Sequence, residues 1–379
     1  MKNIAIMCGG KSYEHAVSII SGIQIAEHID RTKYQPYFVY LNNADEAFLV
    51  ENFSSHKQDF RTNKHTPIDL VKRNGGLALQ RQSLFSKPIK IDAVYNAFHG
   101  GSGEAGPMQG LLAILDVPHT AAGQEGAVLA MNKAVTKEVL VAHNVPVLPW
   151  ISVTKEEFET DRSGIKLRII ETLGMRLIIK PVHLGSSIGI AFANSEIELE
   201  QQLLLALQID SEVLIEPALT EFTEYNIGVR SSENGLQFTP IEEPIRKDAI
   251  LSFDDKYANG SKKGGGKQAG GGMELLDRTI PAKISEELAT EIRAQATAVY
   301  RACRLSGMLR IDFMYSDGKL YCTEPNPVPG SLAFYLWEVN GETFQEQITH
   351  DLEDAIARHK QRITAQPYET DIVEKFIGS

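Results

Sequence analysis

The chain has 379 residues, 43% hydrophobic and 23% charged, a composition typical of globular proteins with more than one domain. Its 38 basic and 49 acidic side chains give a net charge of −11, which argues against sequence-independent nucleic-acid binding. No apolar stretch approaches the roughly 20 residues that cross a bilayer, and three cysteines are too few for a disulfide framework. We therefore expect a cytoplasmic protein with no nucleic-acid or membrane partner.

The first third of the chain alternates strands and helices. Apolar runs at 3–7, 37–41 and 91–98 predict strands, and the helical spacing of apolar residues predicts a helix over 13–29. This alternation is typical of an open parallel sheet, whose ligands lie beyond the carboxyl ends of the strands. His99 opens a glycine-rich segment directly after the third strand, which is the expected place for a substrate loop.

The remainder of the chain contains a second set of strands and helices. We predict helices over 109–115, 127–143, 196–207 and 284–302, and strands over 177–180, 188–192, 213–216, 308–315 and 319–323. The last two strands form a hairpin, with Ser316, Asp317 and Gly318 as its turn. Residues 258–272 are rich in glycine and lysine, which predicts a mobile loop.

The hairpin carries the clearest chemical signal. Alternation places Arg310 and Asp312 on one face of their strand, and the hairpin brings Glu324 and Asn326 beside them. Two carboxylates and an amide oxygen make a hard oxygen site suited to magnesium shared with phosphate oxygens. The alternative is a charged, solvated hairpin face, but the prolines that follow the candidate ligands stiffen the segment and favour a site.

Other candidates are weaker when taken singly. Lys180 ends a strand and precedes a Gly-Ser-Ser loop that can cover phosphates with backbone N–H groups, although an ordinary hairpin turn fits equally well. Glu216 also ends a strand, and Glu224 follows eight residues later. The strand end can bind an adenine and the second carboxylate its ribose, although a surface loop is the alternative interpretation. Glu14 can bind an amine, or can be a solvated helix N-terminus.

Taken together, these pieces resemble one family. Gly9-Gly10, Glu14-His15, His99-Gly100, Gly103-Glu104, Gln109-Gly110, Met131-Asn132-Lys133, Lys180-Pro181, Gly185-Ser186-Ser187, Arg310-Ile311-Asp312 and Glu324-Pro325-Asn326 occur in the order seen in D-alanine–D-alanine ligases. These enzymes are ATP-grasp carboxylate–amine ligases. The resemblance covers residues 3 to about 350. It implies an α/β, three-domain ATP-grasp fold with an N-terminal open parallel sheet domain (1–121), a central small domain (122–216) and a C-terminal domain (217–379), the last two enclosing a nucleotide cleft.

The resemblance also implies a role for each matched residue. ATP is contacted by Lys133, Lys180, Glu216, Leu219 and Glu224. Two Mg²⁺ or Mn²⁺ ions are bound by Asp312, Glu324 and Asn326. Glu14, oriented by Ser186, binds the ammonium group of the first D-alanine. Arg310 and the N–H of Gly330 stabilise the tetrahedral intermediate, and Lys256-Tyr257 ends a lid that closes over the γ-phosphate. Further expected substrate contacts are His99, Ser331 and Tyr335.

Three positions depart from the family pattern. Ala105 replaces the usual aspartate of Gly-Glu-Asp-Gly, the lid is followed by the unusual 258–272 stretch, and Tyr335 replaces a serine that meets the carboxylate of the second substrate. The expected function is ATP- and Mg²⁺-dependent ligation of two D-alanines through an acyl phosphate, for peptidoglycan synthesis, in a homodimer. The alternatives are a ligase that joins a D-amino acid to a different amine or hydroxy acid, and a non-catalytic nucleotide sensor.

Overall fold

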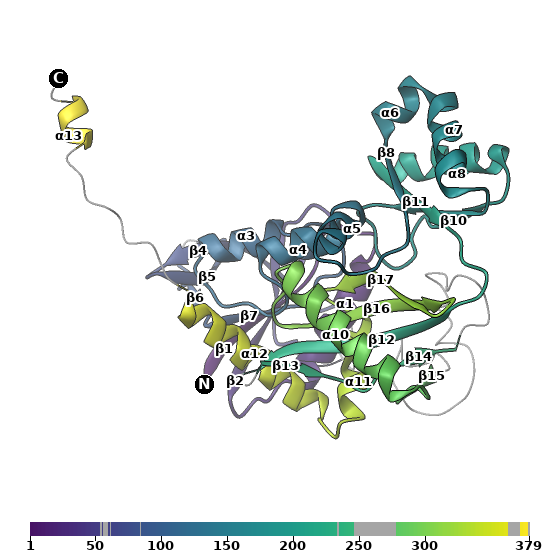
Figure 1. Ribbon diagram of the computed structural model, residues 1–379. Coiled ribbons are helices and arrows are strands. Elements are labelled where there is room, and N and C mark those ends of the chain that lie inside the picture. The colour runs from purple at the N-terminus through teal and green to yellow at the C-terminus, as the bar shows by residue number, and fades with distance from the viewer. Residues whose placement is uncertain are drawn as a thin grey trace.

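The computed structural model describes residues 1–53, 55, 60, 62–83, 85–232, 235–245, 278–362 and 372–377. Its strands form three large sheets, with helices packed against them (Figure 1). Within these ranges, every helix is too short or too polar to cross a membrane. The expected lid residues Lys256 and Tyr257 and the loop at 258–272 lie outside the described residues.

The first sheet has seven strands in the order β6-β5-β4-β3-β2-β1-β7. They are β1 (Lys2–Gly9), β2 (Tyr34–Leu41), β3 (Ala47–Val50), β4 (His65–Arg73), β5 (Gly76–Arg81), β6 (Ile89–Lys90) and β7 (Ala93–Asn96). β1 pairs in parallel with β2 and β7, as the sequence predicts, and helix α1 (His15–His28) makes the crossover. Strands β3 to β6 are antiparallel and extend the sheet beyond the prediction.

The glycines at the end of β1 turn the chain toward α1. Gly9 has a φ of +90°, and a Cβ built on it would lie 2.2 Å from the carbonyl oxygen of Leu41. Only glycine fits there without moving the neighbouring strand. Helices α2 (Gly101–Glu104) and α3 (Pro107–Ile114) follow β7. Because β1 and β7 are parallel, the loops that follow these two strands lie at the same edge of the sheet.

The second sheet has the order β10-β9-β11-β8 and is antiparallel. Its strands are β8 (Ile151–Thr154), β9 (Leu177–Pro181), β10 (Ala191–Ala193) and β11 (Glu212–Pro217), and its helices are α6 (Lys155–Thr160), α7 (Arg162–Leu173) and α8 (Glu196–Ile209). Apolar residues of the sheet pack against α6, α7 and α8 in a core of their own, which includes Ile179, Leu203 and Ile215. In Figure 1 this unit stands apart at the upper right.

The third sheet has the order β13-β12-β16-β17. It contains β12 (Thr223–Ser232), β13 (Gly235–Phe238), β16 (Met308–Ser316) and β17 (Lys319–Asn326), beside a two-stranded sheet of β14 (Glu243–Pro244) and β15 (Arg278–Thr279). Helix α10 (Glu286–Ala302) covers it through Ile292, Ala296 and Val299. The predicted hairpin and helix are therefore present, whereas β12, the strand beside the hairpin, is absent from the sequence prediction.

The helix predicted over 127–143 is two helices. α4 (Gln124–Met131) ends and α5 (Lys133–Ala142) begins at Asn132, whose backbone is extended. The Asn132 side chain accepts a hydrogen bond from the N–H of Val135 at 2.9 Å. An asparagine in this position caps a helix and so starts a new one, which is why the single-helix prediction is wrong.

The end of the chain returns to the first sheet. After the 3₁₀ turn η3 (Gly330–Ala333), α11 (Phe334–Glu338) and α12 (Phe344–Gln361) contribute Leu336, Ile348 and Leu352 to the core that contains Ile4 and Ile6 of β1. Helix α13 (Ile372–Ile377) follows. The N-terminal sheet thus shares a core with the C-terminal helices, while the boundaries expected near 121 and 216 remain a prediction.

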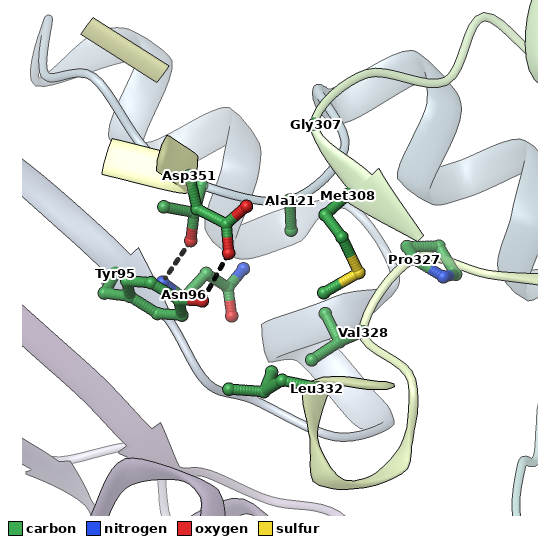
Figure 2. Close-up of a pocket in the computed structure, with 10 residues that line it drawn as sticks. Tyr95, Asn96, Ala121, Gly307, Met308, Pro327, Val328, Leu332 and Asp351 are labelled. Carbon is green, nitrogen blue, oxygen red and sulfur yellow. Dashed lines mark hydrogen bonds between the residues drawn. The ribbon is translucent and has the colours of Figure 1, made fainter. Parts of the chain in front are cut away.

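A small cavity marks this junction between the two ends of the chain (Figure 2). There the Tyr95 hydroxyl of β7 donates a 2.7 Å hydrogen bond to Asp351 of α12. Burial raises the pKa of Asp351 to about 7, and it also raises the pKa of Tyr95 well above the usual value of a tyrosine. The contact ties α12 to the first sheet by a polar bond between buried groups.

Candidate active site

One cleft receives side chains from all three sheets. Its lining includes most of the residues singled out in the sequence, namely Glu14, His99, Lys133, Lys180, Ser186, Glu216, Leu219, Glu224, Arg310, Asp312, Glu324, Asn326 and Gly330. These positions are up to 316 residues apart in the chain. The fold therefore brings together groups that the sequence shows only as separate motifs.

Glu14 lies at the start of α1 and is buried. Its carboxylate accepts a short hydrogen bond from the Ser186 hydroxyl, which reaches it from the loop after β9. The backbone of Ser186 is left-handed, with a φ of +50°, and this turn directs the loop toward the first sheet. The predicted pair of Glu14 and Ser186 is in contact, and it places a buried carboxylate at one end of the cleft.

His99 is buried beside Glu14 at the end of the first sheet. One ring nitrogen, Nε2, hydrogen bonds with the Ser21 hydroxyl at 2.8 Å. Burial lowers the pKa of His99 to about 4, so the imidazole is neutral near pH 7. It can position a substrate by hydrogen bonding but adds no positive charge to the cleft.

Glu104 is a buried cleft residue for which the sequence predicts no role. Its carboxylate accepts hydrogen bonds from the N–H of Gly100 at 2.6 Å and the N–H of Val328 at 3.1 Å. It therefore joins the glycine loop of the first sheet to the loop after β17. Burial, reinforced by the charge of Glu14, raises the pKa of Glu104 to about 8.

A buried group of lysines surrounds Glu216. Both Lys180 and Lys137 form short ion pairs with its carboxylate, and Lys137 also donates to the carbonyl of Leu148 at 3.0 Å. Burial opposes ionisation of Glu216, but the two ammonium groups outweigh it and lower its pKa to about 2. Lys137 was missed; its spacing of four residues from Lys133 on a helix was the available signal.

The end of the cleft formed by the second and third sheets is partly apolar. Leu219 and Glu224 line it together with Ile178, Phe192 and Met314. Glu224 is on β12, directly opposite Met314 of β16. Apolar side chains beside a strand edge and a carboxylate can hold a flat heterocycle and a sugar.

The hairpin residues form the candidate metal site. β16 and β17 pair Asp312 with Glu324 and Arg310 with Asn326, as predicted. The Asn326 amide nitrogen donates to Asp312 at 3.1 Å, which leaves its oxygen available for another partner. No cluster of three His, Cys, Asp or Glu residues is placed to hold a metal in the described ranges. The set of two carboxylates and an amide oxygen fits magnesium, which takes few protein ligands.

Arg310 faces the same space. Its Nε and Nη2 each donate to Asp312 at 2.7 Å, and the pKa of the buried guanidinium is raised by that carboxylate despite the cost of burial. The third nitrogen, Nη1, is buried and has no hydrogen-bond partner among the described residues. A preorganised donor of this kind can stabilise an oxyanion.

Comparisons with known proteins agree with this geometry. The family models described as D-ala D-ala ligase N-terminus and C-terminus match residues 3–122 and 139–352. The D-alanine–D-alanine ligase of Thermosipho africanus is 30% identical over 367 residues, covering 96% of this chain and 95% of its own, and that of Thermosipho melanesiensis is 31% identical over 368 residues, covering 96% of each. The chain belongs to the D-alanine–D-alanine ligase family.

Solved structures of similar shape support the fold. The D-alanine–D-alanine ligase of Coxiella burnetii has a TM-score of 0.79 at 23% identity, with 100% of this chain and 97% of that chain covered. The VanG D-Ala:D-Ser ligase of Enterococcus faecalis has a TM-score of 0.74 at 22% identity, covering 94% and 99%. The fold is the ATP-grasp fold of this family, whose members are ATP-dependent ligases, and the chain is such an enzyme.

Two residues expected at the second-substrate end of a family site lie just behind the cleft. Ser331 and Tyr335 are buried, and neither is among the residues that line it. The Tyr335 hydroxyl donates to Glu242 at 3.0 Å, and its ring packs against the Arg278 guanidinium at 4.1 Å. Tyr335 therefore contacts a cleft residue, Glu242, and its expected contact with the substrate remains a prediction.

Proposed function

We propose that this ligase joins two D-alanines at the expense of ATP, with two divalent cations and an acyl-phosphate intermediate, and so supplies peptidoglycan precursor. The observation that carries this proposal is the convergence in one cleft of an amine-binding carboxylate (Glu14), phosphate-binding lysines, a hard oxygen site and the buried Nη1 of Arg310. The names of the relatives, D-alanine–D-alanine ligases, supply the substrate.

In this proposal, ATP lies along the second and third sheets. Leu219 and the strand end at Glu216 contact the adenine, and Glu224 accepts hydrogen bonds from the ribose hydroxyls. Lys133 and Lys180 contact the phosphates, together with Lys256 and Tyr257 from the lid. Because Lys137 also pairs with Glu216, that carboxylate keeps a partner when Lys180 turns toward a phosphate.

Asp312, Glu324 and Asn326 would hold the divalent cations, Mg²⁺ or Mn²⁺. When bound, these ions offset the negative charge of the triphosphate, which otherwise repels an attacking carboxylate. The oxygen ligands face the same cleft as the lysines, so the phosphates would lie between the two positive groups.

The reaction then follows in two steps. Glu14, held by Ser186, binds the ammonium of the first D-alanine, whose carboxylate oxygen attacks the γ-phosphorus and releases ADP. The neutral amine of the second D-alanine attacks the acyl carbon and loses one proton as the amide forms. Arg310 and the N–H of Gly330 stabilise the oxyanion that forms, and phosphate leaves with the carboxylate oxygen. Ser331, Tyr335 and His99 complete the substrate contacts, and the lid excludes water, which would hydrolyse the acyl phosphate.

The proposal also includes the domain division at 1–121, 122–216 and 217–379, a homodimer and a cytoplasmic location. A ligase for a different amine or hydroxy acid would use the same first subsite, and a nucleotide sensor would need no oxyanion donor. Phosphate release from ATP, measured with a panel of D- and L-amino acids and D-hydroxy acids, separates the three. D-alanine alone should give rapid release; release only with a mixed pair supports the other ligase, and no release supports the sensor.

A further inference from the structure

Four polar residues lie side by side, three of them on the third sheet and the fourth on the segment that pairs with its strand β12. Backbone pairing places Asn226 of β12 opposite Asp312 of β16, and Asp312 opposite Glu324 of β17. On the other side, Asn226 exchanges two backbone hydrogen bonds with Glu242, at 2.9 and 2.8 Å. Directly opposed residues of antiparallel strands share a face of the sheet, and all four side chains line the cleft. Figure 1 shows β12 between β14 and β16.

The orientation of the Asn226 amide is fixed by Glu242. A carboxylate only accepts hydrogen bonds, so the amide nitrogen must face it, and it donates to Glu242 at 3.2 Å. Glu242 is itself held by Arg278 at 2.9 Å and by the Tyr335 hydroxyl at 3.0 Å. The amide oxygen of Asn226 therefore points away from Glu242.

That oxygen lacks a partner in the described part of the chain. Asn226 is 1% exposed, and its Oδ1 is buried without a hydrogen bond to any described residue. Leaving a buried acceptor unsatisfied costs free energy, so a ligand that satisfies it is expected. The adjacent side chain on β16 is Asp312, an expected cation ligand, and an acceptor beside a carboxylate favours a positively charged ligand.

We propose that Asn226 is a further oxygen ligand of the divalent-cation site and that its Oδ1 and Asp312 hold one of the two ions. Opposed side chains have Cβ atoms about 5 Å apart, a span that one ion can bridge. Glu324 and Asn326 lie on the far side of Asp312 and hold the other ion. This inference rests on the proposed function, because it assigns a residue to the cations that accompany ATP.

The test is Mn²⁺ binding, followed by electron paramagnetic resonance of the free ion, with the full-length protein and a non-hydrolysable ATP analogue. We expect the natural chain to bind two Mn²⁺ ions. Asn226→Leu should weaken the affinity for one of these two ions by tenfold or more, which is the size of effect that loss of a metal-supporting group has. Analogue binding in EDTA, measured by calorimetry, should not change. The same substitution at Asn340, an exposed residue that donates to a backbone carbonyl outside the cleft, should leave Mn²⁺ binding unchanged.

Asn226→Asp is the second variant, because it keeps an oxygen toward the ion while losing the donor to Glu242. We expect it to bind Mn²⁺ as tightly as the natural chain or more tightly, whereas a purely structural amide would lose affinity. Unchanged Mn²⁺ affinity in Asn226→Leu would overturn the inference, and so would an equal loss of analogue affinity in EDTA. If the natural chain binds the analogue but no Mn²⁺, the metal site of the proposed function fails instead.

Discussion

Replacing Lys137 by methionine should destabilise the protein and weaken ATP binding. Methionine preserves the length of the side chain but removes one of the two ammonium groups that hold the buried Glu216. The pKa of Glu216, lowered from 4.5 to about 2, corresponds to about 3 kcal/mol of stabilisation of its charge. Lys180 remains as a partner and burial of Lys137 itself has a cost, so we expect a loss of about 2 kcal/mol rather than the full 3–5 kcal/mol of a broken buried pair.

Urea unfolding of the natural chain, Lys137→Met, Glu216→Gln and the double variant measures this loss and the coupling between the two residues. The double variant should recover part of the stability that Lys137→Met loses, because the uncompensated charge is gone. Lys137→Met should also raise the KM for ATP, since Lys180 then stays paired with Glu216. Equal stability of Lys137→Met and the natural chain, or strictly additive effects in the double variant, would refute this account of the lysine group.

Three further predictions concern the cleft and the junction of the chain ends. Glu324→Gln should keep the melting temperature and lose most phosphate release at ordinary Mg²⁺; near-normal turnover would show that the ligand assignment is wrong. The pKa of Glu104 is about 8 in the folded chain, whereas its ordinary value is 4.5. Between these pH values the folded state keeps a proton that the unfolded state has lost, so the free energy of unfolding should fall as pH rises from about 4.5 to 8. Glu104→Gln should flatten that part of the urea-midpoint profile, and an unchanged slope would contradict the assignment. Leu352 is fully buried in the shared core, and its replacement by alanine should lower the free energy of unfolding by about 2–5 kcal/mol. A change below about 1 kcal/mol would mean that α12 is only loosely packed against the first sheet.

The strand pairing and the turn that the sequence predicted correctly depend on local geometry. Asp317 and Gly318 have positive φ values of 50° and 74°, which suit the turn that joins β16 to β17. Once that turn is recognised, alternation alone aligns Asp312 with Glu324. Strand ends followed by glycine, as at Gly9, were equally readable, because a run of apolar residues and its interruption are both local in the sequence.

The parts that were missed depend on contacts between distant segments. The sequence of β12 is Thr-Glu-Tyr-Asn-Ile-Gly-Val-Arg-Ser-Ser. Its polar residues Glu224 and Asn226 interrupt the apolar pattern that would predict a strand, because one face of this strand lines the cleft. Glu104 gains its role from the N–H of Val328, 224 residues away. The sequence around β12 and around Glu104 gives no indication of these contacts.

The same limit applies to Tyr335. The family pattern implies a substrate contact for Tyr335, which stays a prediction, and the structure adds that its hydroxyl donates to Glu242 on a segment 93 residues earlier. The sequence around Tyr335 contains no sign of that carboxylate. Only the return of the chain past the third sheet brings the two together.

Ligation through an acyl phosphate requires that an oxygen atom pass from the carboxylate of D-alanine to the phosphate that is released. The protein is incubated with ATP, Mg²⁺ and D-alanine labelled with ¹⁸O in its carboxylate, and the phosphate and dipeptide are analysed by mass spectrometry. If the carboxylate attacks the γ-phosphorus, each phosphate released carries one ¹⁸O atom, with one D-alanyl-D-alanine and one ADP formed. Unlabelled phosphate, or label found in AMP, would contradict the account.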